Sequence, residues 1–589
     1  MRVFEANISL SVADFFTKEL INISNVAKAN DFLEIICGIN PFFSDESELI
    51  ELKERLAVTF SSVEEPDRAE YGDFQTNSIL ANKITIHLLE QGIKPEIIIE
   101  PTCGKGNFIL ASLNNFNEIR KIIGVEIYKP YVWETKFNVL DFYLKNPESN
   151  KPSIEIFHYN VFDFDFKKLS SQINNYNLLI IGNPPWVTNS QLGSLNSNNL
   201  PQKANFKNQN GLDAMTGKGN FDIAEYIVLS LFDAFQGVNG HLALLLKNSI
   251  AKNIVFDQKA KQYRIGSIEK HCIDSKKEFN VSVASSLFSC KLNTNPEFEC
   301  QEYNFYSKNS LIRFGWVGNK FVSNTANYLH NKSIDGICPF EWRQGIKHDC
   351  SAVMELEKTN GHYLNNLKEN VVIEDELVYG LLKSSDLKNT VIEETRKYII
   401  VTQSKVGQQT NYLKHKVPET YRYLNKYLPV FQARKSSIYK GKPMFSIFGI
   451  GDYSFKPFKV AISGLYKTFH FTLVLPQNDK PVMLDDTCYF IGFDNIEFSV
   501  YATILLNLSQ TKEFLQSITF PDAKRVFTKD ILMRIDLFKL AINCPMRNIE
   551  EQLKLMNEKY GFDLDLKLWD NFIKEMTPVK EKQMTLFGH

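Results

Sequence analysis

Two short stretches carry residue types suited to binding an adenosine-containing ligand. The first, IIIEPTCGKGNF, runs from an apolar strand into a turn with Gly104 and Gly106, and a helix is expected from Asn107. Glycines let the backbone turn tightly and approach a ligand, and a helix start favours negative groups. The second stretch ends another apolar strand in Glu126, where open α/β sheets bind ribose hydroxyls. The glycine spacing matches neither a P-loop nor GxGxxG.

A third stretch, Asn183-Pro184-Pro185-Trp186, directly follows the apolar run NLLIIG. Two prolines remove two backbone donors and mark a loop, so the simplest interpretation is a strand that ends in a polyproline turn. Its position favours a functional role, because it follows the fourth expected strand, after the glycine turn on the first and the acid on the second. We call residues 183–186 the NPPW segment and assign it to the same site.

These stretches need a scaffold of alternating strands and helices. Six apolar runs predict strands, with helical segments such as FDIAEYIVLSLFDAF between some of them: PEIIIEPTCG, KIIGVEIY, SIEIFHYNVF, YNLLIIGNPPW, HLALLLKNS and SVASSLFSCKL. Apolar strands with helical crossovers predict a mostly parallel sheet covered on both faces. We therefore expect a doubly wound, Rossmann-like α/β fold, whose ligand sites lie at the carboxyl ends of its strands.

The chain, at 589 residues, is too long for a single core. Residues 1–65 place apolar positions at helical spacing, which predicts a helical N-terminal segment packed on a neighbour. The α/β pattern occupies residues 66–310. Residues 311–589 mix Gly, Lys, Tyr and Phe without βαβ units and predict a mixed α+β domain.

The composition excludes several classes of protein. There is no run of about 18 apolar residues and no secretory signal, so we expect a cytoplasmic protein with no membrane span. Nine scattered cysteines without a CxxC pair argue against a disulfide framework and against a metal site. The net charge is −1, yet residues 391–470 hold 14 Lys and Arg against 4 Asp and Glu. Such a basic, aromatic-rich block predicts a polyanion-facing surface.

The combination resembles the S-adenosylmethionine-dependent amino-methyltransferases of DNA, in which (D/N/S)PP(Y/F/W) follows the fourth strand. EYGDFQTN at 70–77 is similar to their cofactor-methionine segment, EPTCGKGNF to their cofactor turn, and FNVSV at 279–283 to their late aromatic segment. The motif order, with a long C-terminal region last, is that of the gamma group, whose prototypes methylate adenine N6. The resemblance covers about residues 66–300 and implies a restriction-modification enzyme with a Rossmann-like methyltransferase sheet, S-adenosylmethionine as cofactor and double-stranded DNA as partner.

The resemblance assigns the cofactor to the first three strands and the NPPW segment. Glu126 would accept hydrogen bonds from the ribose hydroxyls, Glu100 would contact the methionine amine, and the 70–77 segment would flank that end. Relatives usually place an Asp after the third strand. Here we prefer Asn160 to Asp163, with a turn residue as the competing role for Asn160. The full expected set is Tyr71, Thr76, Glu100, Thr102, Gly104, Gly106, Glu126, Ile127, Asn160 and Asn183.

The same resemblance gives the NPPW segment its chemistry. A purine amine is a poor nucleophile, and the Asn183 side-chain oxygen and the Pro184 carbonyl would hold and orient it without a deprotonating base. The base must leave the duplex, and Trp186 and Phe279 would stack on its two faces. A core role is the alternative for Phe279. Pro185 completes the expected catalytic set.

The C-terminal region is expected to recognise DNA. Residues 336–357 and the basic block resemble target-recognition regions of gamma-order enzymes. Arg343 and Lys347 suit base-edge or phosphate contacts, although each basic residue has a solvated surface charge as its alternative. The candidates for phosphate contacts are Lys405, Lys414, Lys416, Arg434, Lys435, Lys456 and Lys459. The polar run 187–219 is expected to order on DNA, with an ordinary surface loop as its alternative.

Other functions remain open at this point. They are cytosine N4 methylation, methylation of RNA or of a protein, a fused restriction and methylation enzyme, and a non-catalytic DNA-binding subunit. Asn before Pro-Pro favours adenine, the long C-terminal region favours DNA, and the intact NPPW segment and cofactor acids favour an enzyme. No PD…(E/D)xK cluster occurs in the right order. We therefore expect a separately encoded restriction endonuclease and a monomer on DNA.

Overall fold

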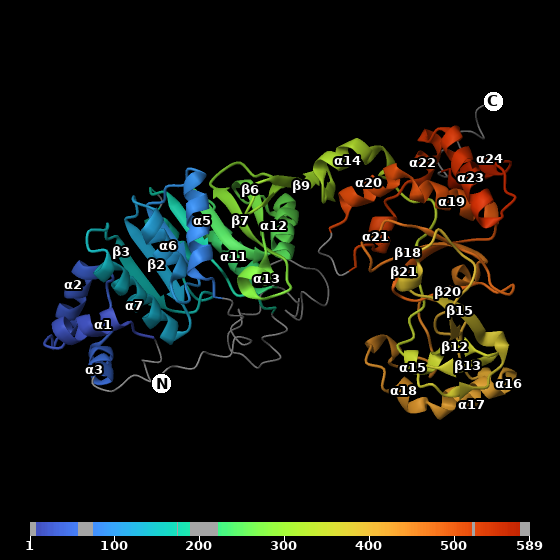
Figure 1. Cartoon of the computed structure of the whole chain (residues 1–589), viewed down its shortest axis with the longest axis horizontal. Coiled ribbons are helices and arrows are strands. Elements are labelled where there is room, and N and C mark those ends of the chain that lie inside the picture. The colour runs from blue at the N-terminus through green and yellow to red at the C-terminus, as the bar shows by residue number, and fades with distance from the viewer. Residues whose placement is uncertain (1–6, 57–74, 174, 189–221, 521–524, 578–589) are drawn as a thin grey trace. The chain divides into compact units, whose positions relative to one another are not determined.

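The computed structural model describes residues 7–56, 75–173, 175–188, 222–520 and 525–577. The chain forms two compact units, Met1–Phe321 and Val322–His589 (Figure 1). Each unit has its own sheets and its own buried apolar core. Among the described residues, no helix is both long and apolar enough to cross a membrane.

The first unit begins with helices that pack on a longer helix of the α/β layer. They are α1 (Leu10–Phe15), α2 (Val26–Cys37) and α3 (Glu46–Leu56), and the longer helix is α7 (Lys129–Lys145). Asn25 caps α2 through its side chain, and Gly38 ends it with a φ of 74°. Phe16 and Phe42 are buried against Trp133 and Phe137 of α7. The helical N-terminal segment therefore shares the core of the α/β layer.

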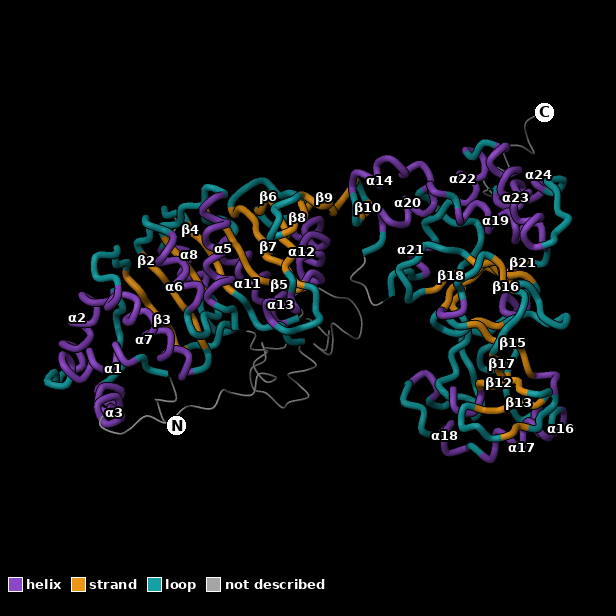
Figure 2. The backbone as a smooth tube through the Cα atoms, viewed as in Figure 1, coloured by secondary structure: helices purple, strands orange, loops and turns teal. Residues whose placement is uncertain are grey.

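A ten-stranded sheet is the centre of this unit, in the order β10-β9-β8-β6-β7-β5-β4-β1-β2-β3 (Figure 2). The five strands from β5 to β3 are parallel, and β7 runs antiparallel between β5 and β6. The strands are β1 (Ile97–Glu100), β2 (Lys121–Glu126), β3 (Ser153–His158), β4 (Leu178–Gly182), β5 (Gly240–Lys247), β6 (Ile265–Ile273), β7 (Ser285–Leu292), β8 (Glu299–Asn304), β9 (Ser310–Val317) and β10 (Lys320–Val322).

All six expected strands are present, but the last of them is the seventh in chain order. Strand β6 was not expected, because its run IGSIEKHCI carries charged residues that mask the apolar pattern. The structure satisfies those charges within the sheet. Lys270 pairs with Glu302 at 2.7 Å, and Glu269 lies 2.9 Å from His271.

Helices cover both faces of the sheet, which confirms the Rossmann-like α/β fold. One layer holds α5 (Ser78–Glu90), α6 (Asn107–Asn115) and α7, which contact one another in sequence. The other holds α8 (Phe166–Gln172), α11 (Ile223–Phe235) and α12 (Asn248–Lys261). A short helix, α13 (Ser275–Phe279), precedes β7. The strands β9 and β10 extend the sheet beyond residue 310, and the second unit begins at Val322.

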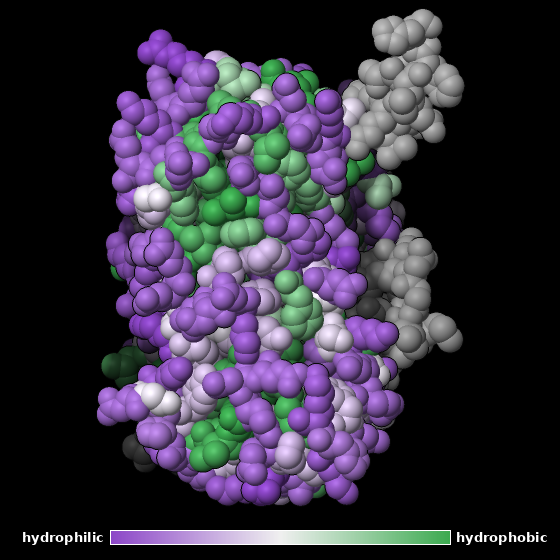
Figure 3. All heavy atoms as spheres, turned by 90° about the vertical axis from the view of Figure 1, so that its right-hand side faces the viewer, coloured by the Kyte–Doolittle hydropathy of each residue, from purple (hydrophilic) through white to green (hydrophobic). Residues whose placement is uncertain are grey.

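The second unit is mixed α and β, with one five-stranded and one six-stranded sheet. Figure 3 shows one face of it, where hydrophilic side chains predominate and apolar ones gather in smaller areas. Its strands are β11 (Arg343–Gln344), β12 (Glu355–Thr359), β13 (His362–Asn365), β14 (Asn370–Val371), β15 (Val378–Leu382), β16 (Val391–Ile392), β17 (Lys397–Ile400), β18 (Phe458–Ser463), β19 (Thr472–Val474), β20 (Met483–Leu484) and β21 (Cys488–Phe493). Its helices are α14 (Thr325–Asn331), α15 (Ser351–Met354), α16 (Leu413–Lys416), α17 (Pro418–Lys426), α18 (Leu428–Gln432), α19 (Ile496–Asn507), α20 (Ser509–Ile518), α21 (Lys529–Leu532), α22 (Leu537–Asn543), α23 (Met546–Tyr560) and α24 (Trp569–Met576).

Candidate active site

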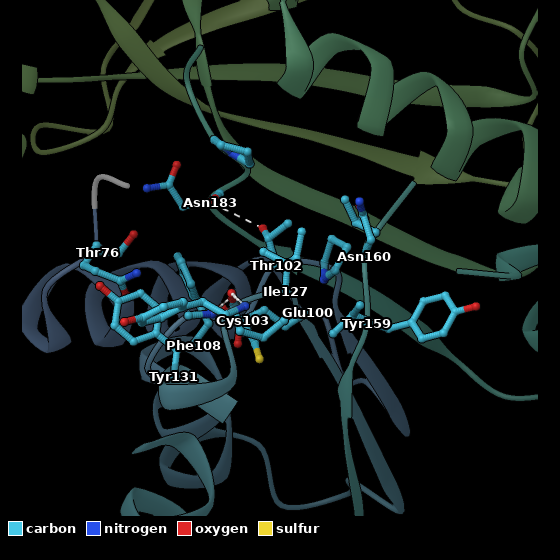
Figure 4. A pocket seen from close by; sticks show the side chains of 18 of the residues that line it. Thr76, Glu100, Thr102, Cys103, Phe108, Ile127, Tyr131, Tyr159, Asn160 and Asn183 are labelled. Atoms are coloured by element: carbon cyan, nitrogen blue, oxygen red, sulfur yellow. Dashed lines mark hydrogen bonds between the residues drawn. The ribbon is translucent and has the colours of Figure 1, made fainter. Parts of the chain in front are cut away.

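A pocket lies at the carboxyl ends of β1 to β4, where the fold predicts a ligand site. It encloses about 870 Å³ not filled by protein atoms, open solvent at its mouth included, which is the size of a small-molecule site. Figure 4 shows side chains from several separate segments converging on it. Eight of the ten expected cofactor residues line it: Thr76, Glu100, Thr102, Gly104, Glu126, Ile127, Asn160 and Asn183.

Glu126 is held in place by backbone amides on both of its oxygens. The Gly104 N–H donates to Oε2 at 2.9 Å, and the Tyr128 N–H donates to Oε1 at 2.7 Å. From the other side, the Thr135 hydroxyl donates to the Gly104 carbonyl at 2.8 Å. The carboxylate is thus fixed at the pocket wall, and its oxygens are of the kind that accepts hydrogen bonds from hydroxyl groups.

The two glycines of the cofactor turn have different roles. Gly104 lines the pocket with a φ of 52°, and a Cβ there would lie 2.6 Å from the Gln75 side-chain oxygen. Gly106 precedes α6 with a φ of 80°, and a Cβ there would lie 2.7 Å from the Thr135 methyl group. Gly106 does not line the pocket. Glycine is therefore needed at position 106 for the turn and for the close approach of α7. A contact with the cofactor is not the reason.

Glu100 and Thr76 place buried polar atoms at one end of the pocket. Glu100 is 2% exposed and Thr76 5%. Within the described residues, neither Glu100 Oε2 nor the Thr76 hydroxyl has a hydrogen-bond partner. Burial raises the pKa of Glu100 well above its usual range, and the Glu126 carboxylate adds to the rise. Such atoms fit the ammonium end of S-adenosylmethionine, because a cationic donor would satisfy both of them.

Asn160 lines the pocket, whereas Asp163 is exposed and does not line it. The Asn160 side-chain oxygen accepts from the Phe162 N–H at 3.1 Å. The residue therefore caps a turn after β3 while it faces the pocket, so the two competing roles coincide. Tyr71 and the polar run beyond Thr188 lie outside the described residues.

The NPPW segment leaves β4 beside the cofactor turn. Asn183 and Pro185 line the pocket, but Pro184 and Trp186 do not. The Thr102 hydroxyl donates to the Asn183 carbonyl at 3.4 Å, as the dashed line in Figure 4 shows. The asparagine is thereby joined to the turn that forms one wall of the pocket.

Trp186 and Phe279 do not form the open slot that we expected for a flipped base. Their rings lie 5.1 Å apart in an edge-on arrangement and contact each other. Trp186 is 5% exposed, and its Nε1 donates to the Leu245 carbonyl at 3.3 Å. A base stacked between the rings would require them to separate. The structure therefore shows no open slot between the two rings, because the indole packs into the core beside β5.

Several pocket residues were not predicted. They are Gln75, Pro101, Cys103, Asn107, Phe108, Val125, Tyr128, Tyr131, Tyr159, Val161 and Phe162, whereas Pro185 was expected in a catalytic role. Most of them flank the expected residues in sequence, so their position next to the ends of β1, β2 and β3 was the available signal. The aromatic members offer faces for a purine ring.

In the second unit, the candidate DNA-binding residues divide into three groups by their surroundings. Lys405, Lys414 and Lys435 are exposed, and the described part of the chain gives them no ion pair. Four others have carboxylate neighbours. Lys416 pairs with Glu376, Lys456 with Asp494, Arg343 with Glu341, and Lys347 lies 3.3 Å from Asp349.

Two of the expected phosphate contacts are structural residues. Lys459 is 1% exposed, its ammonium donates to the Lys456 carbonyl at 2.7 Å, and burial lowers its pKa to about 7. Arg434 donates to four backbone carbonyls, of His348, Phe431, Met444 and Ser446, and its guanidinium lies 3.7 Å from the Tyr439 ring centre. The burial of Lys459 speaks against a phosphate contact at that position, whereas Arg434 is partly exposed and also holds backbone of the unit.

Comparison with known proteins places the chain in a family. No family model matches it. The type II methyltransferase M.NspV of Nostoc sp. (strain ATCC 29411 / PCC 7524) is 39% identical over 484 residues, which are 81% of this chain and 98% of that protein. The type IIL restriction-modification enzyme MmeI, solved in complex with DNA, has a similar fold, with a TM-score of 0.52 and 11% identity over 97% of this chain and 93% of that one. The chain thus belongs to the type II methyltransferases of restriction-modification, and S-adenosylmethionine is its methyl donor.

Proposed function

We propose that this methyltransferase modifies the exocyclic N6 of adenine in double-stranded DNA, after the base has left the helix. The observation that carries the proposal is the place of Asn183, which lines the cofactor pocket at the end of β4 and is joined to the cofactor turn through Thr102. An asparagine before two prolines supplies an amide oxygen and a proline carbonyl, which suit an amine with two hydrogens.

The residues of the pocket divide the work between binding and orientation. S-adenosylmethionine supplies an electrophilic methyl group on a sulfonium. Glu126 accepts from the ribose hydroxyls, and Glu100 with Thr76 holds the methionine ammonium. Asn183 and the Pro184 carbonyl accept from the target amine and direct its lone pair toward the methyl group. Orientation at short range supplies most of the acceleration, and the Phe279 and Trp186 rings are the surfaces on which the base stacks once they separate.

DNA as the substrate is supported by the second unit and by the relatives. MmeI was solved in complex with DNA, and the exposed lysines Lys405, Lys414 and Lys435 suit phosphate contacts. Arg343 is a candidate for a base contact, because its planar guanidinium lies 4.7 Å from the Tyr453 ring centre and is partly exposed. We propose that the enzyme acts as a monomer beside a separately encoded endonuclease.

Transfer of a labelled methyl group tests the proposal. Purified protein is incubated with labelled S-adenosylmethionine and, in separate reactions, with duplex DNA of random sequence, RNA or a protein extract. Nucleoside mass spectrometry of the DNA is expected to find N6-methyladenine, and light scattering is expected to find one chain per complex. Label in RNA or protein alone, or N4-methylcytosine in the DNA, would contradict the proposal. DNA with Mg²⁺ should remain uncut, since site-specific cutting would show a fused nuclease.

A further inference from the structure

A buried ion pair links the start of α11 to the end of β5, next to the NPPW segment. Lys247 Nζ lies 2.5 Å from Asp222 Oδ2, and the two side chains are 14% and 12% exposed. Asp222 also caps α11, because its other oxygen accepts from the Ala224 N–H at 3.2 Å. Lys247 is the last residue of β5. The pair therefore fixes the beginning of a helix to the edge of the sheet that carries the site.

The end of the NPPW segment and the two residues after it are attached to the start of α11 and to β5, the two elements that this pair joins. Thr188 pairs antiparallel with Asp222, and the Ile223 N–H donates to the Val187 carbonyl at 2.9 Å. On the other side, Trp186 donates to the carbonyl of Leu245, two residues before Lys247. The residues after Pro185 thus have three attachments. Two of them lie at the start of α11, at Asp222 and Ile223, and the third lies on β5.

The end of β5 also lies between the two halves of the proposed base site. In the sheet, β5 is flanked by β4, which precedes the NPPW segment, and by β7, which follows Phe279. Gly182 of β4 is in register with Leu244 of β5, and Lys247 is in register with Ser285 of β7. A displacement at Lys247 would therefore reach the segments on both sides.

A second buried pair provides a comparison within the same sheet. Lys270 Nζ lies 2.7 Å from Glu302 Oε2, with 7% and 16% of the side chains exposed, and joins β6 to β8. It matches the first pair in burial and distance, yet neither Lys270 nor Glu302 lines the pocket. Burying such charges is costly without a partner. Both pairs should therefore affect stability to a similar degree.

We propose that Asp222 and Lys247 are positioning residues, which hold the NPPW segment in the orientation needed for methyl transfer. The inference rests on the proposed transfer to a nucleobase amine. Loss of the pair would let the segment shift, and a displacement of about 1 Å in a reacting group costs about 100-fold in rate. Cofactor binding should persist, because Glu100 and Glu126 lie on β1 and β2 and do not depend on this attachment.

The test compares Asp222→Asn with Glu302→Gln in the full-length protein. Steady-state kinetics on a methylatable duplex gives kcat and the KM for S-adenosylmethionine, and thermal unfolding gives Tm. Asp222→Asn should lower kcat about 100-fold while that KM changes less than about threefold, since an interaction made in the transition state acts on kcat. Glu302→Gln should lower Tm by about as much as Asp222→Asn does, but it should leave kcat within about threefold of the wild-type value. Lys247→Arg, which keeps the charge, should retain more activity than Lys247→Gln.

The double variant Asp222→Asn/Lys247→Met distinguishes a loss of positioning from a loss of stability. It also replaces a single variant that does not fold. It leaves no unpaired buried charge, so Tm should recover, but the attachment is absent and kcat should stay low. Equal kcat values for Asp222→Asn and Glu302→Gln, or recovery of kcat together with Tm in the double variant, would overturn the inference. A wild-type protein that methylates no nucleobase would instead contradict the proposed function itself.

Discussion

The two units differ in how closely their chemistry follows from the order of residues along the chain. In the first unit, motifs from four separate strand ends converge on a single pocket. In the second, the basic residues are distributed among different environments: some are exposed, some face carboxylates, and Lys459 is buried. Parallel strands bring their carboxyl ends to one edge by necessity, whereas a local excess of positive charge has no such geometric consequence.

Replacing the amide at the centre of the pocket should have the largest effect. We expect Asn183→Ala to lower kcat for methyl transfer about 10²–10³-fold, the effect of removing one group that orients or stabilises a transition state. Binding of S-adenosylhomocysteine, measured by calorimetry, should change less than about threefold, because Glu100 and Glu126 remain. Asn239→Ala, at the opposite edge of the sheet before β5, is the matched control. Equal losses in the two variants would remove the contrast between the pocket and the rest of the molecule.

The next effect concerns the pH dependence of cofactor binding. Glu100 has a raised pKa, so its carboxyl stays protonated above the usual range in the free protein, and a bound ammonium would favour the carboxylate. Binding should then release a proton, and affinity should rise with pH toward the raised pKa. We expect Glu100→Gln to lower the affinity for S-adenosylhomocysteine about 10–100-fold, which is the effect of losing a hydrogen bond to a charged group.

Calorimetry in two buffers of different ionisation enthalpy measures that proton directly. The wild type should release it and Glu100→Gln should not. Thr76→Val, which changes the neighbouring neutral group, should weaken binding and keep the proton release. Release that is the same in Glu100→Gln and in the wild type would assign the proton to another residue.

A smaller effect is expected in the second unit, where exposure is the criterion that sorts the lysines. Replacing Lys405, Lys414 and Lys435 together with Gln should lower the affinity for duplex DNA about tenfold. It should also reduce the slope of log K against log salt by up to about 0.9 per lysine. The control triple variant replaces Lys554, Lys559 and Lys567, in and after α23, with Gln. It changes the net charge equally. Identical salt slopes for the two variants would mean that overall charge, not these positions, governs binding.

The smallest effect should come from replacing Lys459. This replacement tests whether the residue acts on stability through its burial or on DNA binding through a contact. Its pKa is lowered to about 7 by burial, so the unfolded state binds a proton that the folded state lacks between about pH 7 and the usual lysine pKa. Stability from this group is therefore present above the usual lysine pKa, is lost as pH falls from that value to about 7, and is absent at lower pH. We expect Lys459→Met to raise Tm by about 2–4 °C at pH 6, to raise it less at pH 10, and to leave DNA affinity unchanged. A loss of DNA affinity would restore Lys459 as a contact.

The features that could be predicted from the sequence are those that depend on neighbouring residues, and the others depend on contacts between distant segments. The Rossmann-like sheet and eight of the residues that line the pocket could be predicted, because apolar strands and the residues at their ends are local features of the sequence. The strand β6 could not, since its charged residues are satisfied only by partners such as Glu302 that lie far along the chain. Nor could the burial of Trp186 or the link between Asp222 and Lys247, which depend on how β5 packs beside the NPPW segment. The burial of Lys459 depends in the same way on the sheet of the second unit.

The most direct test of the central claim is modification-sensitive sequencing of DNA from cells that express the protein. Cells with the wild type should carry N6-methyladenine at one recurring sequence, and cells with Asn183→Ala should lack that mark. The same mark in both, N4-methylcytosine in place of methyladenine, or no mark with the wild type would contradict the account.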